Sequence, residues 1–181
     1  MTASLVLAST AYAGSYVEAL REGFRRGDQP AKKPGEIDKI EADFEAFFAR
    51  LTIKTGDVVL PNGELIPRVP SDVFFLVDGD TFIGEAGVRY ILNDWLLQIG
   101  GHVGYGIRPM FQRQGYGKLI LKLSLDILRE SGVEKALVTC YDYNIGSARI
   151  IEANGGVLAN LIDDPRGGGK SRRYWIDLKK A

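Results

Sequence analysis

The stretch QRQGYG, residues 112–117, combines residue types that suit phosphate binding. Gly115 and Gly117 carry no side chain, so a ligand can approach the main chain closely. An apolar helical pattern follows at once, and the first N–H groups of a helix lack intrahelical partners. Those free donors and the positive end of the helix macrodipole favour a diphosphate, with Arg113 and Lys118 adding charge. Taken alone, however, two glycines before a helix are equally consistent with a purely structural turn.

Other ligand-binding motifs are incomplete in this sequence. The stretch RGGGKS, residues 166–171, lacks a P-loop pattern because Asp164 stands where the first glycine is required, and strand-like alternation follows instead of a helix. The glycines of residues 115–117 do not continue to the third glycine of a dinucleotide fingerprint. With one cysteine, Cys140, and one histidine, His102, the chain has no internal disulfide and no four-ligand zinc site. We therefore expect no metal.

Length and charge set the class of protein. The 181 residues, 45% of them hydrophobic, predict one domain, residues 1–181, with a sizeable core. Lys+Arg 23 balances Asp+Glu 23, which argues against nucleic-acid or anionic-membrane partners. No run reaches the roughly 18 apolar residues that span a bilayer. Residues 3–14 have the small-x-small pattern of a secretory signal but no basic start, so a first strand at Leu5–Ala8 and a cytoplasmic location are expected.

The hydrophobic periodicity predicts which elements position these residues. Helices are expected over 15–26 and 37–51, followed by an irregular segment over 52–71 that is either a substrate-facing loop or a plain connector. Two β-runs joined at residues 78–80 form a hairpin, and a third strand ends at Pro109. A helix over 115–131, a strand over 135–141, a short helix over 144–154 and a closing hairpin complete the chain. This order predicts an α/β fold of the α+β type with a mixed sheet, not a doubly wound one.

At this point the pattern resembles a known family. QRQGYG, residues 112–117, is similar to the Q/R-x-x-G-x-G/A signature of the GNAT N-acetyltransferase superfamily. The strand with GYGIRP before it, the strand ALVTCY and the segment NIGSARIIEANGG after it follow in the family's order and spacing. The resemblance covers residues 72–178 well and the first 70 residues only by element order. It implies a central sheet of about seven strands, helices on both faces and a splayed acetyl-CoA cleft, with residues 1–71 as the acceptor-side half and 72–181 as the coenzyme-binding half.

The resemblance also implies how acetyl-CoA, the cosubstrate, is held. The strand end at Ile107, with the backbone of Arg108 and Pro109, is expected to hydrogen-bond the pantetheine arm, and Gly104 and Gly106 suit a bulged strand. The pyrophosphate-binding and helix residues expected to contact the coenzyme are Gln112, Arg113, Gly115, Tyr116, Gly117, Lys118, Asn144 and Ser147. Asn144 also has a purely structural explanation, as the N-cap of the short helix.

The implied reaction is direct transfer of acetyl to an amine within one ternary complex, with the backbone N–H of Ile107 as oxyanion donor. His102 is a candidate base because its ordinary pKa suits the task, although a lone histidine is often structural; Glu85 is the alternative. Many family members place a tyrosine acid seven residues after the asparagine, where this chain has Ile151. Tyr141 and Tyr143 could supply the proton instead, or solvent could. Cys140 is a poor candidate for a nucleophile.

The acceptor is an amine of a small molecule or of a peptide or protein N-terminus. Arg89, Tyr90, Asn93 and Trp95 are candidate pocket residues whose chemistry does not discriminate between acceptors, and homodimerisation is left open. Because the usual tyrosine is missing, an alternative function is a catalytically weak module that binds acyl-CoA and acts as a regulator or sensor.

Overall fold

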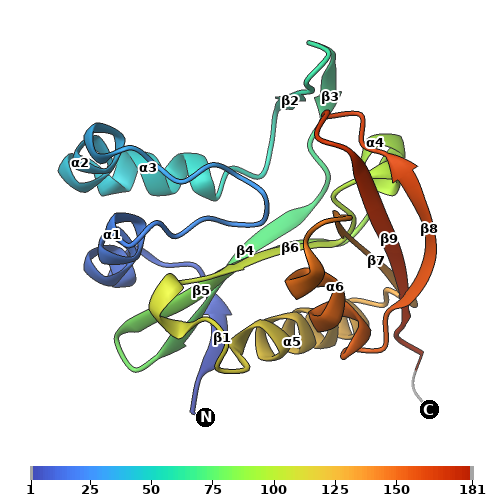
Figure 1. The fold of residues 1–181 in the computed structure, drawn as a ribbon. Coiled ribbons are helices and arrows are strands. Elements are labelled where there is room, and N and C mark those ends of the chain that lie inside the picture. Colours follow the sequence, from blue (N-terminus) through green and yellow to red (C-terminus); the bar gives the residue numbers. More distant parts are fainter. Residues whose placement is uncertain (1, 180–181) are drawn as a thin grey trace.

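The structure is a computed structural model that describes residues 2–179 (Figure 1). The strands are β1 (Ser4–Leu7), β2 (Asp57–Val59), β3 (Leu65–Pro67), β4 (Ser71–Asp78), β5 (Thr81–Arg89), β6 (Val103–Ile107), β7 (Lys135–Tyr141), β8 (Val157–Asp163) and β9 (Lys170–Asp177). The α-helices are α1 (Ala13–Arg21), α2 (Pro34–Ala42), α3 (Phe44–Leu51), α4 (Asp94–Gln98), α5 (Tyr116–Glu130) and α6 (Ile145–Glu152), and single 3₁₀ turns occupy Thr10–Tyr12 and Pro109–Phe111. The mixed α/β fold predicted from the sequence is confirmed.

The strands form two main sheets that meet at β6 and β7. One sheet has the order β1-β4-β5-β6 and the other has the order β7-β9-β8. Together they supply the seven strands that the sequence predicted. The small β2-β3 hairpin stands apart from both sheets.

Helices cover both faces of the first sheet because side chains on β4 alternate between them. Phe75 and Val77 pack on one face with Tyr16 of α1 and with Phe82, and α2 and α3 complete this cluster. Leu76 faces the other way and packs against Ile120 of α5. Figure 1 shows α1 to α3 on one side of the strands and α5 on the other.

Three local predictions were wrong, and one helix was missed. The helix expected over 37–51 breaks into α2 and α3 at Asp43, whose side chain accepts a hydrogen bond from Ala46 N–H and so caps the second helix. The irregular segment 52–71 contains the β2-β3 hairpin, and the sequence did not reveal α4. The β5-β6 register runs without a shift, so β6 has no bulge. Gly106 instead allows the backbone of residue 25 to pack closely against β6, because a Cβ at Gly106 would lie 2.2 Å from the Arg25 carbonyl oxygen.

The two sheets are joined at the start of β6 and then separate. His102 donates its backbone N–H to the Leu137 carbonyl at 2.7 Å, and its Nδ1 accepts the Leu137 N–H at 2.9 Å. A Cβ at Gly101 would lie 2.3 Å from the Leu137 carbonyl oxygen, so only glycine permits this close approach. Beyond this joint no ladder connects β6 to β7 among residues 2–179, and a cleft opens between the strands.

Candidate active site

The turn before α5 presents free backbone donors. Gly115 is the N-cap of α5 in the left-handed conformation, with φ of 91°, and no side chain caps the helix. Within the described chain, no hydrogen bond is formed by the N–H groups of residues 113–117, whereas Lys118 and Leu119 both donate to the Gly115 carbonyl. Arg113 is the one non-glycine residue of the described chain with positive φ, at 62°. The turn therefore holds a row of donors at the positive end of a 15-residue helix.

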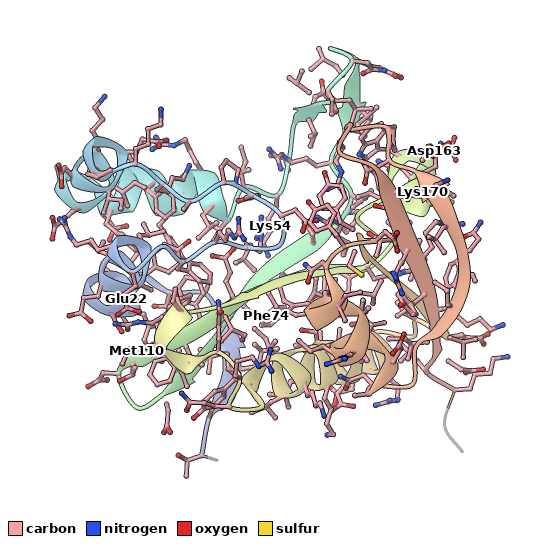
Figure 2. The ribbon with its side chains drawn as sticks, viewed as in Figure 1. Glu22, Lys54, Phe74, Met110, Asp163 and Lys170 are labelled. Atoms are coloured by element: carbon pink, nitrogen blue, oxygen red, sulfur yellow. The ribbon has the colours of Figure 1, made fainter. Side chains whose placement is uncertain are left out.

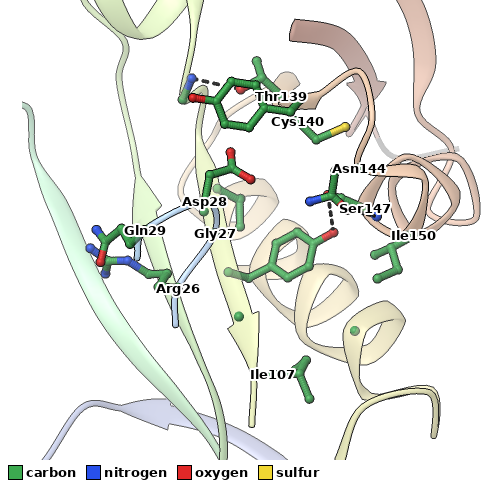
Figure 3. A pocket seen from close by; sticks show the side chains of 18 of the residues that line it. Arg26, Gly27, Asp28, Gln29, Ile107, Thr139, Cys140, Asn144, Ser147 and Ile150 are labelled. Atoms are coloured by element: carbon green, nitrogen blue, oxygen red, sulfur yellow. Dashed lines mark hydrogen bonds between the residues drawn. The ribbon is translucent and has the colours of Figure 1, made fainter. Parts of the chain in front are cut away.

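These donors border a cleft of about 620 Å³ where β6 and β7 separate (Figure 3). Its lining comes from residues 26–29 after α1, from β6, from the turn before α5, from the end of β7 and from the first turns of α6. Gly117 leaves it open on the helix side, because a Cβ there would lie 2.6 Å from Cδ1 of Ile150. The volume lies within the range of small-molecule sites.

One edge of β6 is available to a ligand along this cleft. Arg108 N–H bonds to the Ile83 carbonyl on the β5 side, and backbone groups of successive strand residues point to opposite edges. The N–H of Ile107 therefore points toward the cleft. Gln112 Nε2 donates to the Ile107 carbonyl at 3.0 Å, and Gly27 N–H donates to the Tyr105 carbonyl at 2.9 Å.

The predicted coenzyme residues divide into two groups. Those that line the cleft are Ile107, Gln112, Arg113, Gly117, Asn144 and Ser147. The other group does not belong to the lining that the described residues form: Arg108, Pro109, Gly115, Tyr116 and Lys118. Tyr116 packs its ring edge against Phe111. Gly115 lies within the donor turn and offers a free N–H, whereas the Lys118 N–H is donated to the Gly115 carbonyl, so the predicted role of Lys118 rests on its side-chain charge.

Arg108 points its side chain away from the cleft, toward α1. Its Nε and Nη2 donate to both carboxylate oxygens of Glu22, at 3.0 and 2.6 Å, and Nη2 also reaches Glu18. This guanidinium lowers the pKa of Glu22, which lies beside Met110 in Figure 2. The bidentate pair ties α1 to the end of β6.

Asn144 caps α6, because its Oδ1 accepts the Ser147 N–H at 3.0 Å. Ser147 Oγ in turn lies 3.1 Å from the hydroxyl of Tyr105. Both predicted residues thus face the cleft through structural contacts that need no ligand to explain them.

His102 occupies a structural position in the described chain. It is 6% exposed, does not line the cleft, and uses Nδ1 to accept the Leu137 N–H. Burial, aided by the nearby charge of Arg89, lowers the pKa of His102 below 6.5. The base role stays a prediction, and this geometry gives it little support.

Glu85 is enclosed on the acceptor side of β5. It is 1% exposed, receives the Tyr16 hydroxyl at 2.9 Å and pairs with Arg26 Nη1 at 2.7 Å. Burial and this carboxylate raise the pKa of Tyr16 well above 10. Glu85 is not among the described residues that line this cleft, so its catalytic role also stays a prediction.

The tyrosines at the end of β7 differ in access. Tyr141 lines the cleft, with Arg166 over one side of its ring at 4.5 Å and Tyr143 stacked at 5.1 Å. Tyr143 is 70% exposed and is not part of the lining in the described chain. Ile151, where the family's usual acid would stand, is fully buried in the core.

Two acid–base candidates in the cleft, Asp28 and Tyr105, were not predicted from the sequence. Asp28 is the one carboxylate in the lining formed by the described residues, and burial raises its pKa although Arg166 opposes the shift. Figure 3 shows its side chain directed into the cleft. Tyr105 lines the same space and burial raises its pKa as well. The Asp28 loop carries no motif; Tyr105 was visible only as one residue of GYGIRP.

Two antiparallel sheets thus separate beside the free N–H groups of a helix start. The Acetyltransferase (GNAT) domain model matches residues 38–157, more than half of the chain. The chain therefore belongs to the GNAT acetyltransferase family. No curated protein sequence matches it.

Solved structures show the same fold. The ribosomal-protein-S18-alanine N-acetyltransferase from Escherichia coli is 14% identical with a TM-score of 0.57, covering 99% of this chain and 96% of that one. The ribosomal L7/L12 alpha-N-protein acetyltransferase in complex with coenzyme A is 13% identical with a TM-score of 0.62, and the match covers 99% of this chain and 97% of that one. A spermidine N-acetyltransferase SpeG chimera from Vibrio cholerae and hSSAT is 12% identical with a TM-score of 0.61, and the match covers 98% of this chain and 96% of that one. The predicted GNAT fold is confirmed.

Residues 2–179 contain no group of three or more His, Cys, Asp or Glu side chains placed to hold a metal ion. Within the same residues, no helix combines the length and apolar character that crossing a bilayer requires.

Proposed function

We propose that this acetyltransferase uses acetyl-CoA to acetylate a primary amine by direct transfer within a ternary complex. The observation that carries the proposal is the row of free N–H groups at residues 113–117, which opens into the cleft between β6 and β7. A pyrophosphate suits these donors because they point from the positive end of α5. The coenzyme supplies the activated acetyl thioester. The complex of a fold relative with coenzyme A supports this assignment.

The residues of β6 and α5 would bind and orient the coenzyme. Arg113 and Lys118 add positive charge near the pyrophosphate donors, and the cleft-facing edge of β6 offers N–H groups to the pantetheine arm. The N–H of Ile107, directed to the same side, is our candidate oxyanion donor. Gly117 keeps side-chain atoms out of this path.

For the proton of the attacking amine, we propose Asp28 as the acceptor, with His102 and Glu85 as the earlier alternatives. Asp28 is the candidate that faces the cleft, and its raised pKa brings it closer to the pH at which an ammonium must be deprotonated. For the leaving sulfur, Tyr105 and Tyr141 are the candidate donors because both phenols line the cleft. Their raised pKa values keep them protonated at neutral pH.

The rival function is a sensor module that binds acyl-CoA without turnover, and the buried Ile151 at the usual acid position favours it. A thiol-release assay across a panel of amines separates the two. We expect free coenzyme A to appear only when an acceptor is present, and the acceptor to gain one acetyl group by mass spectrometry. Tight acetyl-CoA binding without acceptor-dependent release would favour the sensor, and absence of binding would exclude both.

Variants of the proton-transfer candidates sharpen this test. Asp28→Asn should lower kcat by about 10²-fold or more, the usual effect of general-base catalysis, with coenzyme affinity retained. Tyr105→Phe and Tyr141→Phe should show which phenol protonates the sulfur. Full activity in Asp28→Asn would return the base role to His102 or Glu85.

A further inference from the structure

A second cavity lies on the acceptor side of the first sheet, between the end of α3 and the strands β4 and β5. Its volume is about 320 Å³. Arg26 and Arg89 line both this cavity and the larger cleft, so the two spaces share a wall. A molecule held here would lie next to the proposed acetyl-CoA site.

The guanidinium of Arg89 forms no ion pair with a carboxylate of the described chain. Its Nη1 donates to the carbonyls of Gly100 and Gly101, at 3.4 and 3.0 Å, and the described chain gives it no ion pair. Burial and the like charge of Arg26 lower the pKa of Arg89 to about 10, with no acidic group offsetting the shift. Such a desolvated cation is stabilised by an anion from outside the chain.

The neighbouring charges leave the cavity positive. Arg26 lies over Gly87, where a Cβ would be 3.1 Å from its Nη1, and is already paired with Glu85. Lys54, beside the end of α3 in Figure 2, pairs with Asp72 at 2.5 Å. Arg68 also lines the cavity and has no ion pair within residues 2–179. Two guanidinium groups, of Arg68 and Arg89, are thus uncompensated.

The remaining wall is apolar, and its members include Leu7, Phe48, Leu51, Ile53 and Val73. A cavity with a cationic side and an apolar side suits a small molecule that carries both an anionic and an aliphatic or aromatic group. The planar, forked guanidinium matches a carboxylate in particular.

We infer that Arg89, assisted by Arg68, binds a carboxylate on the acceptor, which is then an amine of amino-acid size with an apolar side chain. This inference rests on the proposed acetyl transfer and names its substrate class. Like-charge repulsion from the same arginines disfavours a polyamine acceptor. Because Arg89 also borders the larger cleft, a carboxylate bound there leaves the adjacent amine close to the coenzyme.

The test compares two product analogues that differ only in charge. Calorimetry measures the dissociation constants of N-acetyl-leucine and N-acetyl-leucinamide with the protein saturated in coenzyme A, and again without coenzyme. We expect the acid to bind at least about tenfold more tightly than the amide, as loss of a charged hydrogen-bond partner implies. Arg89→Gln should abolish the preference, and Arg89→Lys should keep part of it.

Controls keep the outcomes distinct. Arg50→Gln, an exposed substitution on α3, should leave the preference unchanged, and an intact thermal transition establishes that Arg89→Gln is folded. Equal binding of acid and amide, binding of neither, or a preference that survives in Arg89→Gln would overturn the inference. N-acetyl-O-phosphoethanolamine binding more tightly than the acid would overturn the carboxylate assignment. Failure of coenzyme A itself to bind would count against the proposed function instead.

Discussion

The two walls of the cleft are built from different materials. The coenzyme wall, formed by β6, residues 112–117 and α6, presents mainly backbone N–H groups and glycines. The acceptor wall, formed by residues 26–29 and by Arg89 at the end of β5, presents charged side chains, among them Arg26 and Asp28.

This difference explains why one wall is encoded locally and the other is not. A row of backbone donors needs a turn and a helix start, which neighbouring residues specify through glycine positions and periodicity. A side-chain pocket needs segments that are distant in the sequence. Gly27 reaches the Tyr105 carbonyl, and Arg26 reaches Glu85, only after the fold has formed.

The largest expected effect is a loss of acetyl-CoA affinity caused by a substitution in the coenzyme wall alone. Gly117→Val should weaken acetyl-CoA binding at least about a hundredfold, which is about 2.7 kcal/mol, because the branched side chain enters the space between the donor turn and Ile150. Calorimetry measures the loss. Binding of N-acetyl-leucine without coenzyme should be unaffected.

A double variant separates two causes of that loss. If the introduced valine acts by pushing Ile150 aside, adding Ile150→Ala restores affinity; if it blocks the phosphate donors, the loss persists. We expect persistence. Unchanged affinity in Gly117→Val itself would contradict the placement of the pyrophosphate at residues 113–117.

The next effect concerns the contact between the two walls. Gly106→Ala should lower the free energy of unfolding by about 2 kcal/mol, because its Cβ would overlap backbone atoms of Arg25 and Arg26. Gly104→Ala is the matched control on the same strand, since a Cβ there meets no atom within 4 Å. Denaturant unfolding of both variants should show a clear difference; equal stabilities would mean that residues 25–29 do not press on β6.

The smallest effect concerns the joint where the walls begin. His102→Ala should cost about 1 kcal/mol, since Leu137 N–H loses its acceptor, and His102→Asn should cost less because its amide oxygen can replace Nδ1. Coenzyme affinity should change little in either variant. A large fall in kcat with unchanged stability would instead support His102 as the base.

The same residue predicts a pH dependence of stability. The pKa of His102 is lower in the folded protein than its ordinary value of 6.5. The neutral side chain therefore contributes its full share to the free energy of unfolding at pH values above 6.5. As the pH falls below that value, the unfolded chain binds the proton first and stability is lost until the folded pKa is passed. The free energy of unfolding should therefore fall as the pH drops below about 6.5 in the native protein, and less steeply in His102→Asn. Identical slopes would contradict this.

The sequence predicted the fold class, the seven strands and the donor turn because periodicity and glycine spacing are local. It could not show that His102 would meet Leu137, or that Asp28, in a loop without a motif, would face the cleft. Arg89 was visible as a pocket candidate, but its missing carboxylate partner became evident only when the surrounding charges were placed. The break at Asp43 needed the N-cap contact to be seen.

The most direct test of the central claim follows the backbone amides of isotope-labelled protein by NMR during titration with acetyl-CoA. We predict that the amide signals of residues 113–117 and Ile107 shift most and saturate with a micromolar dissociation constant, about 8 kcal/mol. Pantetheine, which lacks the diphosphate, should leave the signals of 113–117 almost unmoved. No shift at these amides under saturating acetyl-CoA would contradict the account.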